Sequence, residues 1–193
     1  MLKDIFVSEV RVNILTVMLP NPDKPYHVRA LVRAVGTEIN AVRRELKRLT
    51  KLGLLKRRPS GNRVYYSVNT DHVYYSDLLS LVIKEKGLGF KIIKNKKQLG
   101  DIKFAVLSRA FARGRESSML DIDLFIVGVV TMEVLEKIIS EEQANDGREI
   151  HYTVMGEDEF QFRKRKNDQF IGRVLAQTRT MLIGDEEEFC SIL

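Results

Sequence analysis

The chain has 193 residues, of which 44% are hydrophobic and 30% are charged, an ordinary composition for a globular protein with one large or two small domains. No apolar run approaches the roughly 20 residues that a membrane-spanning helix needs, so no membrane partner is expected. The single cysteine, Cys190, excludes an internal disulfide and a multi-thiolate metal site. Together with the lack of a signal-peptide pattern, it predicts a cytoplasmic protein.

The net charge of +6 is unevenly distributed along the chain. Residues 1–86 carry 16 Lys and Arg against 8 Asp and Glu, a net charge of +8, whereas residues 87–193 carry 16 against 18, a net charge of −2. Such an excess is expected when one domain faces phosphate groups, although a solvated basic surface is the commoner explanation of charge alone. The pattern of the cations therefore has to decide between the two.

Two closely spaced glycines, Gly87 and Gly89, predict a linker near residues 86–90 and so two domains, 1–86 and 90–193. In the first domain the apolar periodicity predicts helices over 8–19, 26–35, 38–53 and 76–86, and strands over 54–58 and 63–69 joined by a turn at 59–62. In the second it predicts helices over 90–99, 131–143, 157–165 and 169–175, and strands over 102–107, 121–127 and 149–155. The expected fold class is α+β, with a small α/β second domain built on a mixed sheet.

The helix expected over residues 38–53 has two contrasting faces. One is an apolar stripe with spacings of three and four, made of Ile39, Val42, Leu46, Leu49 and Leu52. The other is cationic and carries Asn40, Arg43, Arg44 and Lys47, with Arg48 and Lys51 beside them. Arg and Lys bond guanine or phosphate, and Asn pairs with adenine, so this face fits the major groove of duplex DNA.

The hairpin that follows carries Arg57, Arg58 and Arg63 around its tip, where they are expected to reach phosphates or the minor groove. Helix, short helix, glycine-containing turn, basic helix and basic hairpin form the order of a winged helix-turn-helix. The stretch AVRRELKRLTKLGLLKRRPSGNRVYYSV resembles the recognition helix and wing of the winged-helix transcriptional regulators, the group with the ArsR-like and MarR-like repressors. The resemblance, over about residues 8–86, implies double-stranded DNA as partner and a homodimer, with the helix over 76–86 as the expected interface.

The strand expected over 121–127 begins with two carboxylates, Asp121 and Asp123. Residues two apart on a strand share a face, so the two are expected to converge as ligands of Mg²⁺. Divalent ions held in this way support phosphoryl or nucleotidyl transfer. As the polar face of a half-exposed strand, however, the same pair needs no function.

The segment FAVLSRAFARGRESSMLDIDLFIVG resembles the signature of the minimal nucleotidyltransferases of the DNA polymerase β superfamily, and the resemblance covers about residues 90–193. That signature has Gly-Ser, ten residues and then Asp-x-Asp, commonly with Ala-Arg-Gly just after Gly-Ser. Here the residues 112–114 are Ala-Arg-Gly, and residues 111–120 separate Ala110 from Asp121. The resemblance implies Asp121 and Asp123 as Mg²⁺ ligands, Glu149 as the candidate third carboxylate, and a nucleoside triphosphate as ligand.

The chain departs from that signature at the Gly-Ser pair, which is replaced by Arg109 and Ala110. Glycine lets backbone amides approach a triphosphate closely, and serine adds a hydroxyl donor. Arginine restores positive charge but fills the space, so Arg109 and Arg113 are the expected nucleotide-binding cations while turnover is disfavoured.

The leading interpretation is a DNA-binding transcriptional regulator with a nucleotidyltransferase-like second domain that has lost catalysis. Three alternatives stay open. One is an active Mg²⁺-dependent nucleotidyltransferase targeted by its winged helix, and another is an antitoxin-like protein acting on a helical toxin partner. The third is a second domain with a purely structural role.

Overall fold

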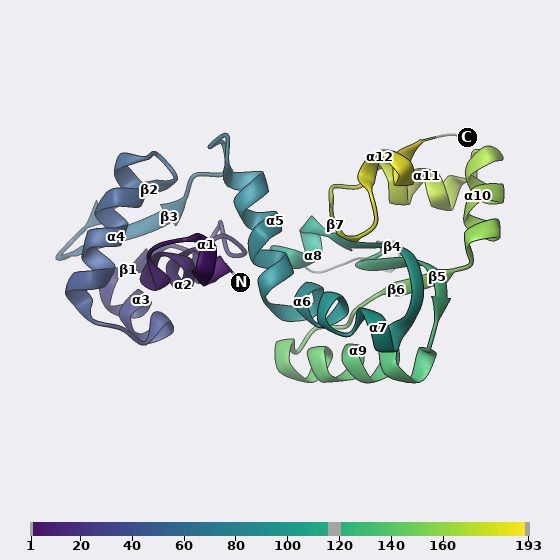
Figure 1. Cartoon of the computed structure of the whole chain (residues 1–193). Coiled ribbons are helices and arrows are strands. Elements are labelled where there is room, and N and C mark those ends of the chain that lie inside the picture. Colours follow the sequence, from purple (N-terminus) through teal and green to yellow (C-terminus); the bar gives the residue numbers. More distant parts are fainter. Residues whose placement is uncertain (1, 116–120, 192–193) are drawn as a thin grey trace. The chain divides into compact units, whose positions relative to one another are not determined.

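The structure, a computed structural model, describes residues 2–115 and 121–191 (Figure 1). The chain divides into two compact units, Met1–Glu85 and Lys86–Leu193. One unit contains an antiparallel sheet and the other a mixed sheet, so the expected mixture of helices and strands is confirmed. Among the described residues, no helix has the length and apolar character needed to span a membrane.

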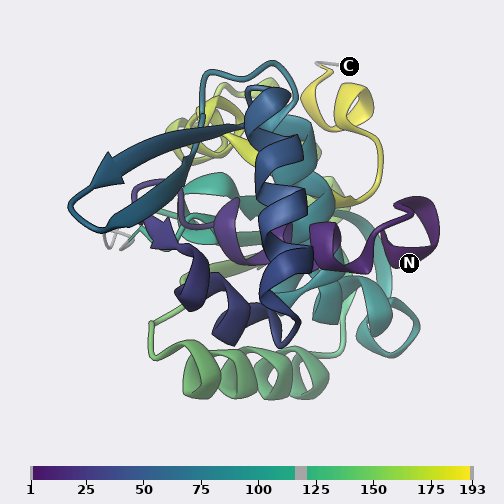
Figure 2. The same ribbon diagram turned by 90° about the vertical axis from the view of Figure 1, so that its left-hand side faces the viewer.

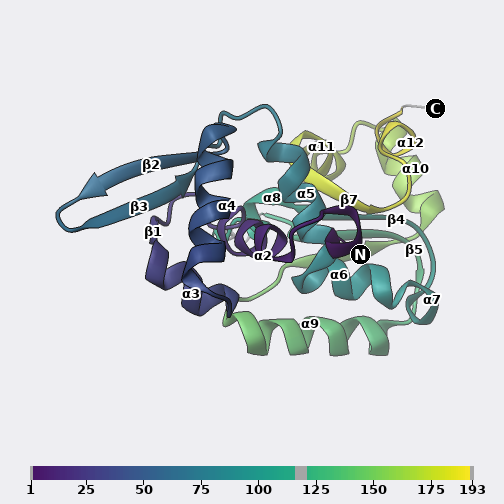
Figure 3. The ribbon, with the colours of Figure 1, turned by 60° about the vertical axis from the view of Figure 1, so that its left-hand side comes forward.

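The first unit is built from helices and a three-stranded sheet. Its elements are α1 (Leu2–Ile5), α2 (Glu9–Met18), β1 (Tyr26–His27), α3 (Val28–Val35), α4 (Ile39–Lys51), β2 (Leu55–Ser60), β3 (Arg63–Val68) and α5 (Tyr75–Glu85). The strand order is β1-β3-β2, and the hairpin of β2 and β3 projects beyond the helices of this unit (Figure 3). The turn predicted over residues 59–62 is shorter than expected. Pro59 and Ser60 extend β2, and only Gly61 and Asn62 form the turn.

Helix α4 buries one face, as its spacing predicts. Val42, Leu46 and Leu49 are almost fully buried. Leu52, expected in the same stripe, is 62% exposed. The reason is that α4 ends at Lys51 in a Schellman motif: Leu54 N donates to Leu49 O (3.1 Å) and Gly53 N to Thr50 O (3.0 Å). Gly53 has φ +77°, a conformation that glycine adopts without strain, and the turn brings Leu54 into the core.

An ion pair joins α2 to the buried side of α4. Arg11 Nε donates to Glu45 Oε2 at 2.8 Å, and the two side chains are only 20% and 11% exposed. Burial opposes ionisation of Glu45, but hydrogen bonds from Arg11 and Ser8 and the charges of Arg11 and Arg48 outweigh it. The pKa of the Glu45 carboxyl therefore lies below its ordinary value.

The elements of the second unit are α6 (Gly87–Lys94), α7 (Lys96–Leu99), β4 (Gly100–Ser108), α8 (Arg109–Ala112), β5 (Leu124–Val130), α9 (Met132–Asp146), β6 (Tyr152–Met155), α10 (Glu157–Arg165), α11 (Gln169–Ala176), β7 (Arg179–Ile183) and α12 (Glu186–Cys190). The sheet order is β6-β5-β4-β7, with β5 and β6 parallel and β4 antiparallel to β5 and β7. Helices α6 and α9 cover one face of the sheet and α10 to α12 the other (Figures 1 and 3). The second face holds an apolar core that includes Phe104, Phe125, Phe160 and Phe189.

The connection expected near residues 86–90 is short, although the chain divides into its two units at this point. Only Lys86 separates α5 from α6, and Gly87 begins α6 with φ +70°, a conformation that glycine adopts without strain. Gly89 is buried within that helix, so the residues predicted as a linker are mostly helical.

Three short elements of the second unit, α8, β7 and α12, have no counterpart in the sequence prediction. The acidic residues Glu186 to Glu188 form the first turn of α12, where carboxylates interact favourably with the helix dipole. Asp185 caps this helix by accepting from Glu188 N at 2.9 Å. Phe189 then lies fully buried against Phe160, with ring centroids 5.3 Å apart.

Removing the cation of the α2–α4 ion pair is expected to destabilise the first unit. Arg11→Met keeps most of the apolar side chain but leaves Glu45 buried without its partner, so the free energy of unfolding should fall by about 2–4 kcal/mol at neutral pH. Five of the six tyrosines lie in residues 1–85, so tyrosine fluorescence in a denaturant titration reports this unit.

The pH dependence gives a second readout of this variant. The pKa of Glu45 is lower in the folded chain than in the unfolded chain. Ionised Glu45 therefore contributes to the free energy of unfolding above the ordinary carboxyl pKa, and this contribution is lost as pH falls through the lowered value. The difference in the free energy of unfolding between the wild-type chain and Arg11→Met should therefore shrink in acid. A difference that does not change with pH would contradict this account. Arg48→Met is the matched control, since Arg48 reaches Glu45 at 3.6 Å but is 62% exposed, and its loss should stay below about 1 kcal/mol.

Candidate functional site

The structure gives an exposed position to every residue predicted to contact DNA. On α4 these are Asn40, Arg43, Arg44 and Lys47, on β2 they are Arg57 and Arg58, and Arg63 begins β3. The α4 residues occupy the side of the helix opposite Val42 and Leu49, which pack into the unit. Figure 2 shows α4 along the outside of the first unit, with the hairpin extending beside it.

The cations of this surface are not neutralised by the rest of the described chain. Neither Arg44 nor Lys47 takes part in any ion pair formed by residues 2–115 and 121–191. Neighbouring cations differ, because Arg48 lies 3.6 Å from Glu45 and Lys56 lies 3.5 Å from Asp71. The outward face of α4 therefore offers guanidinium and ammonium groups whose charge is available to an anionic partner.

The strand register separates the two arginines of β2. Arg57 lies opposite Tyr66 and Arg58 opposite Tyr65. Successive residues of a strand point to opposite faces, so Arg57 and Arg58 occupy different faces of the hairpin. A single flat partner surface contacts only one of them.

An open groove of about 770 Å³ lies next to the predicted surface, between α3, the start of α4 and the hairpin. Its lining includes Arg43 and Arg63 from the predicted set, and also Arg29 and Arg33 of α3, which the sequence analysis missed. The available signal was their spacing of four in a helix whose other side carries the buried Leu31.

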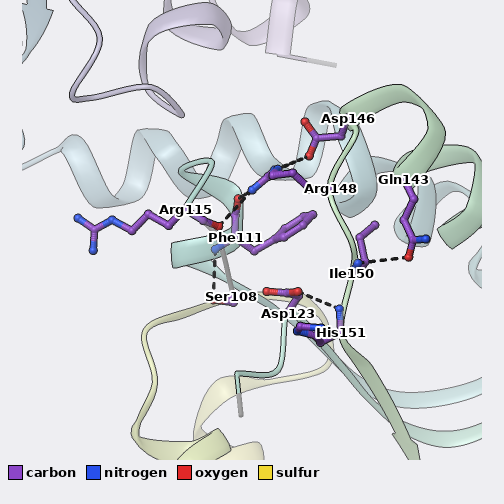
Figure 4. Close-up of polar contacts among 9 residues, drawn as sticks. All are labelled: Ser108, Phe111, Arg115, Asp123, Gln143, Asp146, Arg148, Ile150 and His151. Atoms are coloured by element: carbon purple, nitrogen blue, oxygen red, sulfur yellow. Dashed lines mark hydrogen bonds and ion pairs between the residues drawn. The ribbon is translucent and has the colours of Figure 1, made fainter. Parts of the chain in front are cut away.

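In the second unit the predicted carboxylate pair does not lie on a strand. β5 begins at Leu124, so the strand expected over 121–127 is wrong at its start. Asp121 is exposed, whereas Asp123 is only 1% exposed. Figure 4 shows the Asp123 carboxylate beside His151, whose backbone N–H donates to Asp123 Oδ2 at 2.9 Å. The two carboxylates therefore differ in burial, and the buried one, Asp123, has an oxygen bonded to the segment that leads into β6.

Glu149, the candidate third carboxylate, precedes β6 and is 80% exposed. The strand register instead brings His151 next to Asp123, because Leu124 pairs with Tyr152. No group of three His, Cys, Asp or Glu side chains that suits a metal ion occurs within residues 2–115 and 121–191. Binding of Mg²⁺ through Asp121, Asp123 and Glu149 stays a prediction.

The replaced Gly-Ser position lies at the start of α8. Ser108 ends β4 and is buried, and its Oγ accepts from Phe111 N at 3.4 Å, which caps α8. Arg109 is the first residue of α8 and Arg113 its C-cap, and both are half-buried. Their role in nucleotide binding stays a prediction, and residues 116–120 of the signature segment lie outside the described residues.

Arg148 fixes the end of α8 from another part of the chain. Its Nη1 donates to Phe111 O at 3.1 Å and to Arg115 O at 3.3 Å (Figure 4). Its guanidinium group also lies 4.5 Å from the centroid of the Phe111 ring. The geometry of α8 thus depends on an arginine that the sequence analysis did not single out.

Comparisons of the chain with protein-family models, with curated proteins and with solved structures found no match. Any function proposed for this chain therefore depends on the side chains described above.

We expect Asp123 to be needed for the stability of the second unit. In Asp123→Asn the buried oxygen that accepts from His151 N is replaced in part by an amide donor, so the free energy of unfolding should fall by about 1–3 kcal/mol. Asp101→Asn, at an exposed position of the same unit, is the matched control and should change stability by less than about 0.5 kcal/mol. Denaturant unfolding followed by far-UV circular dichroism measures both, and equal losses would refute the structural role of Asp123.

Proposed function

We propose that the chain is a DNA-binding transcriptional regulator whose first unit is a winged helix-turn-helix domain. The observation that carries this proposal is the outward face of α4, where Asn40, Arg44 and Lys47 are exposed and follow one another at spacings of four and three. In this proposal α4 enters the major groove of duplex DNA and the hairpin of β2 and β3 acts as the wing.

The order of elements supports the same proposal. α3 is a short helix that ends at Gly36, whose φ of +68° turns the chain into α4. A helix-turn-helix needs such a tight corner, because the first helix lies across the DNA while the second enters the groove. The net charge of +8 over residues 1–86 adds a sequence-independent attraction to phosphates.

We propose that the second unit is nucleotidyltransferase-like and acts without turnover, as a sensor of a nucleoside triphosphate. Two observations favour loss of catalysis over an active transferase. Arg109 stands at the start of α8, where the related signature has glycine, and Asp123 is buried with one oxygen bonded to His151 N. Burial of Asp123 limits the access of a substrate phosphate to any metal ion held by this carboxylate.

A homodimer is part of this proposal, because DNA-binding proteins of this kind commonly contact the two halves of a pseudo-palindrome. The predicted interface helix, α5, exposes Leu81 at 39%. Ile5 and Val7 of the same unit are also exposed, at 71% and 103%. These apolar side chains are candidates for burial between two copies of the chain.

The test is a titration of the full chain against duplex DNA from upstream of its own coding sequence and against a scrambled duplex. It runs at two salt concentrations, with and without Mg²⁺ and ATP. Tight, selective and salt-dependent binding is the expected result, and weak binding of both duplexes alike would overturn the proposal. A change of DNA affinity with Mg²⁺ and ATP would support the sensor role, whereas nucleotide transfer to a macromolecule would favour the active enzyme.

Single substitutions on α4 should weaken this binding. Arg44→Ala and Lys47→Ala each remove an exposed cation from the face proposed to enter the groove, and each should cost about 1–3 kcal/mol of binding free energy. Arg173→Ala, which removes an exposed cation from α11 of the second unit, is the matched control and should leave the affinity nearly unchanged. Unchanged affinity of the two α4 variants at about 0.15 M salt would exclude α4 from the interface.

A further inference from the structure

The groove beside α4 collects positive charge from three separate elements. Arg29 and Arg33 come from α3, Arg43 from α4 and Arg63 from the start of β3. All four side chains are exposed, and no acidic residue lines the groove. In the part of the chain that the structure describes, none of the four guanidinium groups forms an ion pair. Their mutual repulsion is therefore uncompensated until an anion binds between them.

The start of α4 adds to the same positive field. Ile39, the first residue of α4, lines the groove, and the N-cap residue Glu38 makes no side-chain cap hydrogen bond. α3 differs, because His27 Nδ1 accepts from Ala30 N at 3.2 Å and so caps that helix. The first-turn N–H groups of α4 thus remain available to an anion, at the end of the helix that carries partial positive charge.

We propose that this groove holds the phosphodiester backbone of one DNA strand, bound by Arg29, Arg33, Arg43 and Arg63. The inference rests on the proposed function and extends it to α3. A helix nearly fills the width of the major groove, about 12 Å, so cations that flank α4 meet the wall of the groove, which is the backbone. Arg29 and Arg33 in this assignment carry no base recognition and fix how α4 is seated.

The assignment predicts a particular signature in salt dependence. Phosphate contacts act alike on every sequence, and each lowers the slope of log affinity against log salt by about one when it is lost. Arg29→Gln and Arg33→Gln should therefore each weaken binding of the native and the scrambled duplex by the same factor, roughly fivefold per bound protomer at about 0.15 M salt. Each should also reduce the salt slope by about one per bound protomer, and the double variant by about two per bound protomer.

The experiment compares these variants in the full chain with two kinds of control. Arg173→Gln removes an exposed cation of α11, outside the groove, and should leave affinity and slope unchanged. Arg29→Lys and Arg33→Lys keep the charge, and they should retain most of the affinity and the wild-type slope. Far-UV circular dichroism identifies any variant that is unfolded. If a glutamine variant is unfolded, the inference is tested by the lysine variant at that position and by the salt slope of the glutamine variant at the other arginine.

Failure of this inference is distinguishable from failure of the proposed function. If the wild-type chain binds neither duplex, both fall. If it binds and Arg44→Ala weakens binding while the groove variants keep the wild-type slope, only the groove assignment is overturned. A loss confined to the native duplex would mean base recognition by α3 and would also overturn it. ATP titrated without DNA provides the last arm: binding that the groove variants abolish, with unchanged DNA affinity, would assign the groove to a free nucleotide.

Discussion

The buried ion pair between Arg11 and Glu45 and the apolar stripe of α4 specify the same rotation of that helix, and the proposed function depends on that rotation. Glu45 lies on the inner side of α4 and is held at 2.8 Å by a side chain from α2. With this contact made, Val42 and Leu46 face the core and Asn40 and Arg44 face solvent. Any other rotation would bury cations or expose leucines, each at a cost well above that of a surface contact. The apolar stripe and the ion pair together therefore determine which face of α4 is exposed.

Around that helix the cations divide by environment into two groups with different proposed tasks. Arg44 and Lys47 project from the middle of the outward face, where a groove-bound helix meets base edges. Arg29 and Arg33 lie at the side, in a groove that also receives Arg63 from the hairpin. Contacts of the first kind discriminate between sequences, and contacts of the second kind supply affinity and orientation. In this proposal, cations on the outward face of α4 select the DNA sequence, and arginines beside α4 attract the DNA backbone.

Sequence patterns predicted the elements that their own residues specify. They missed elements that form only through contacts with residues far away in the sequence. The apolar spacing in α4 identified its buried face, but Leu52 failed because Gly53 ends the helix and Leu54 takes the core position. β1 is two residues long and exists because Tyr26 pairs with Tyr66, a partner far along the chain. The cations of α4 and the hairpin were found from sequence alone, whereas the groove with Arg29 was not. Three elements that are separate in the sequence form that groove, so it arises only from the tertiary structure.

The second unit illustrates why motif spacing alone is a weak guide to metal chemistry. Asp-x-Asp predicts a convergent pair only if both residues belong to a strand, since alternation then gives them a common face. Here β5 starts one residue after Asp123, and the amide of His151 reaches that carboxylate in a buried position. A carboxylate that accepts from His151 N stabilises the approach of β6 to β5, and its burial sets it apart from the exposed Asp121. The spacing of two residues therefore predicts a shared face only where the strand includes both carboxylates, and here β5 begins after the second.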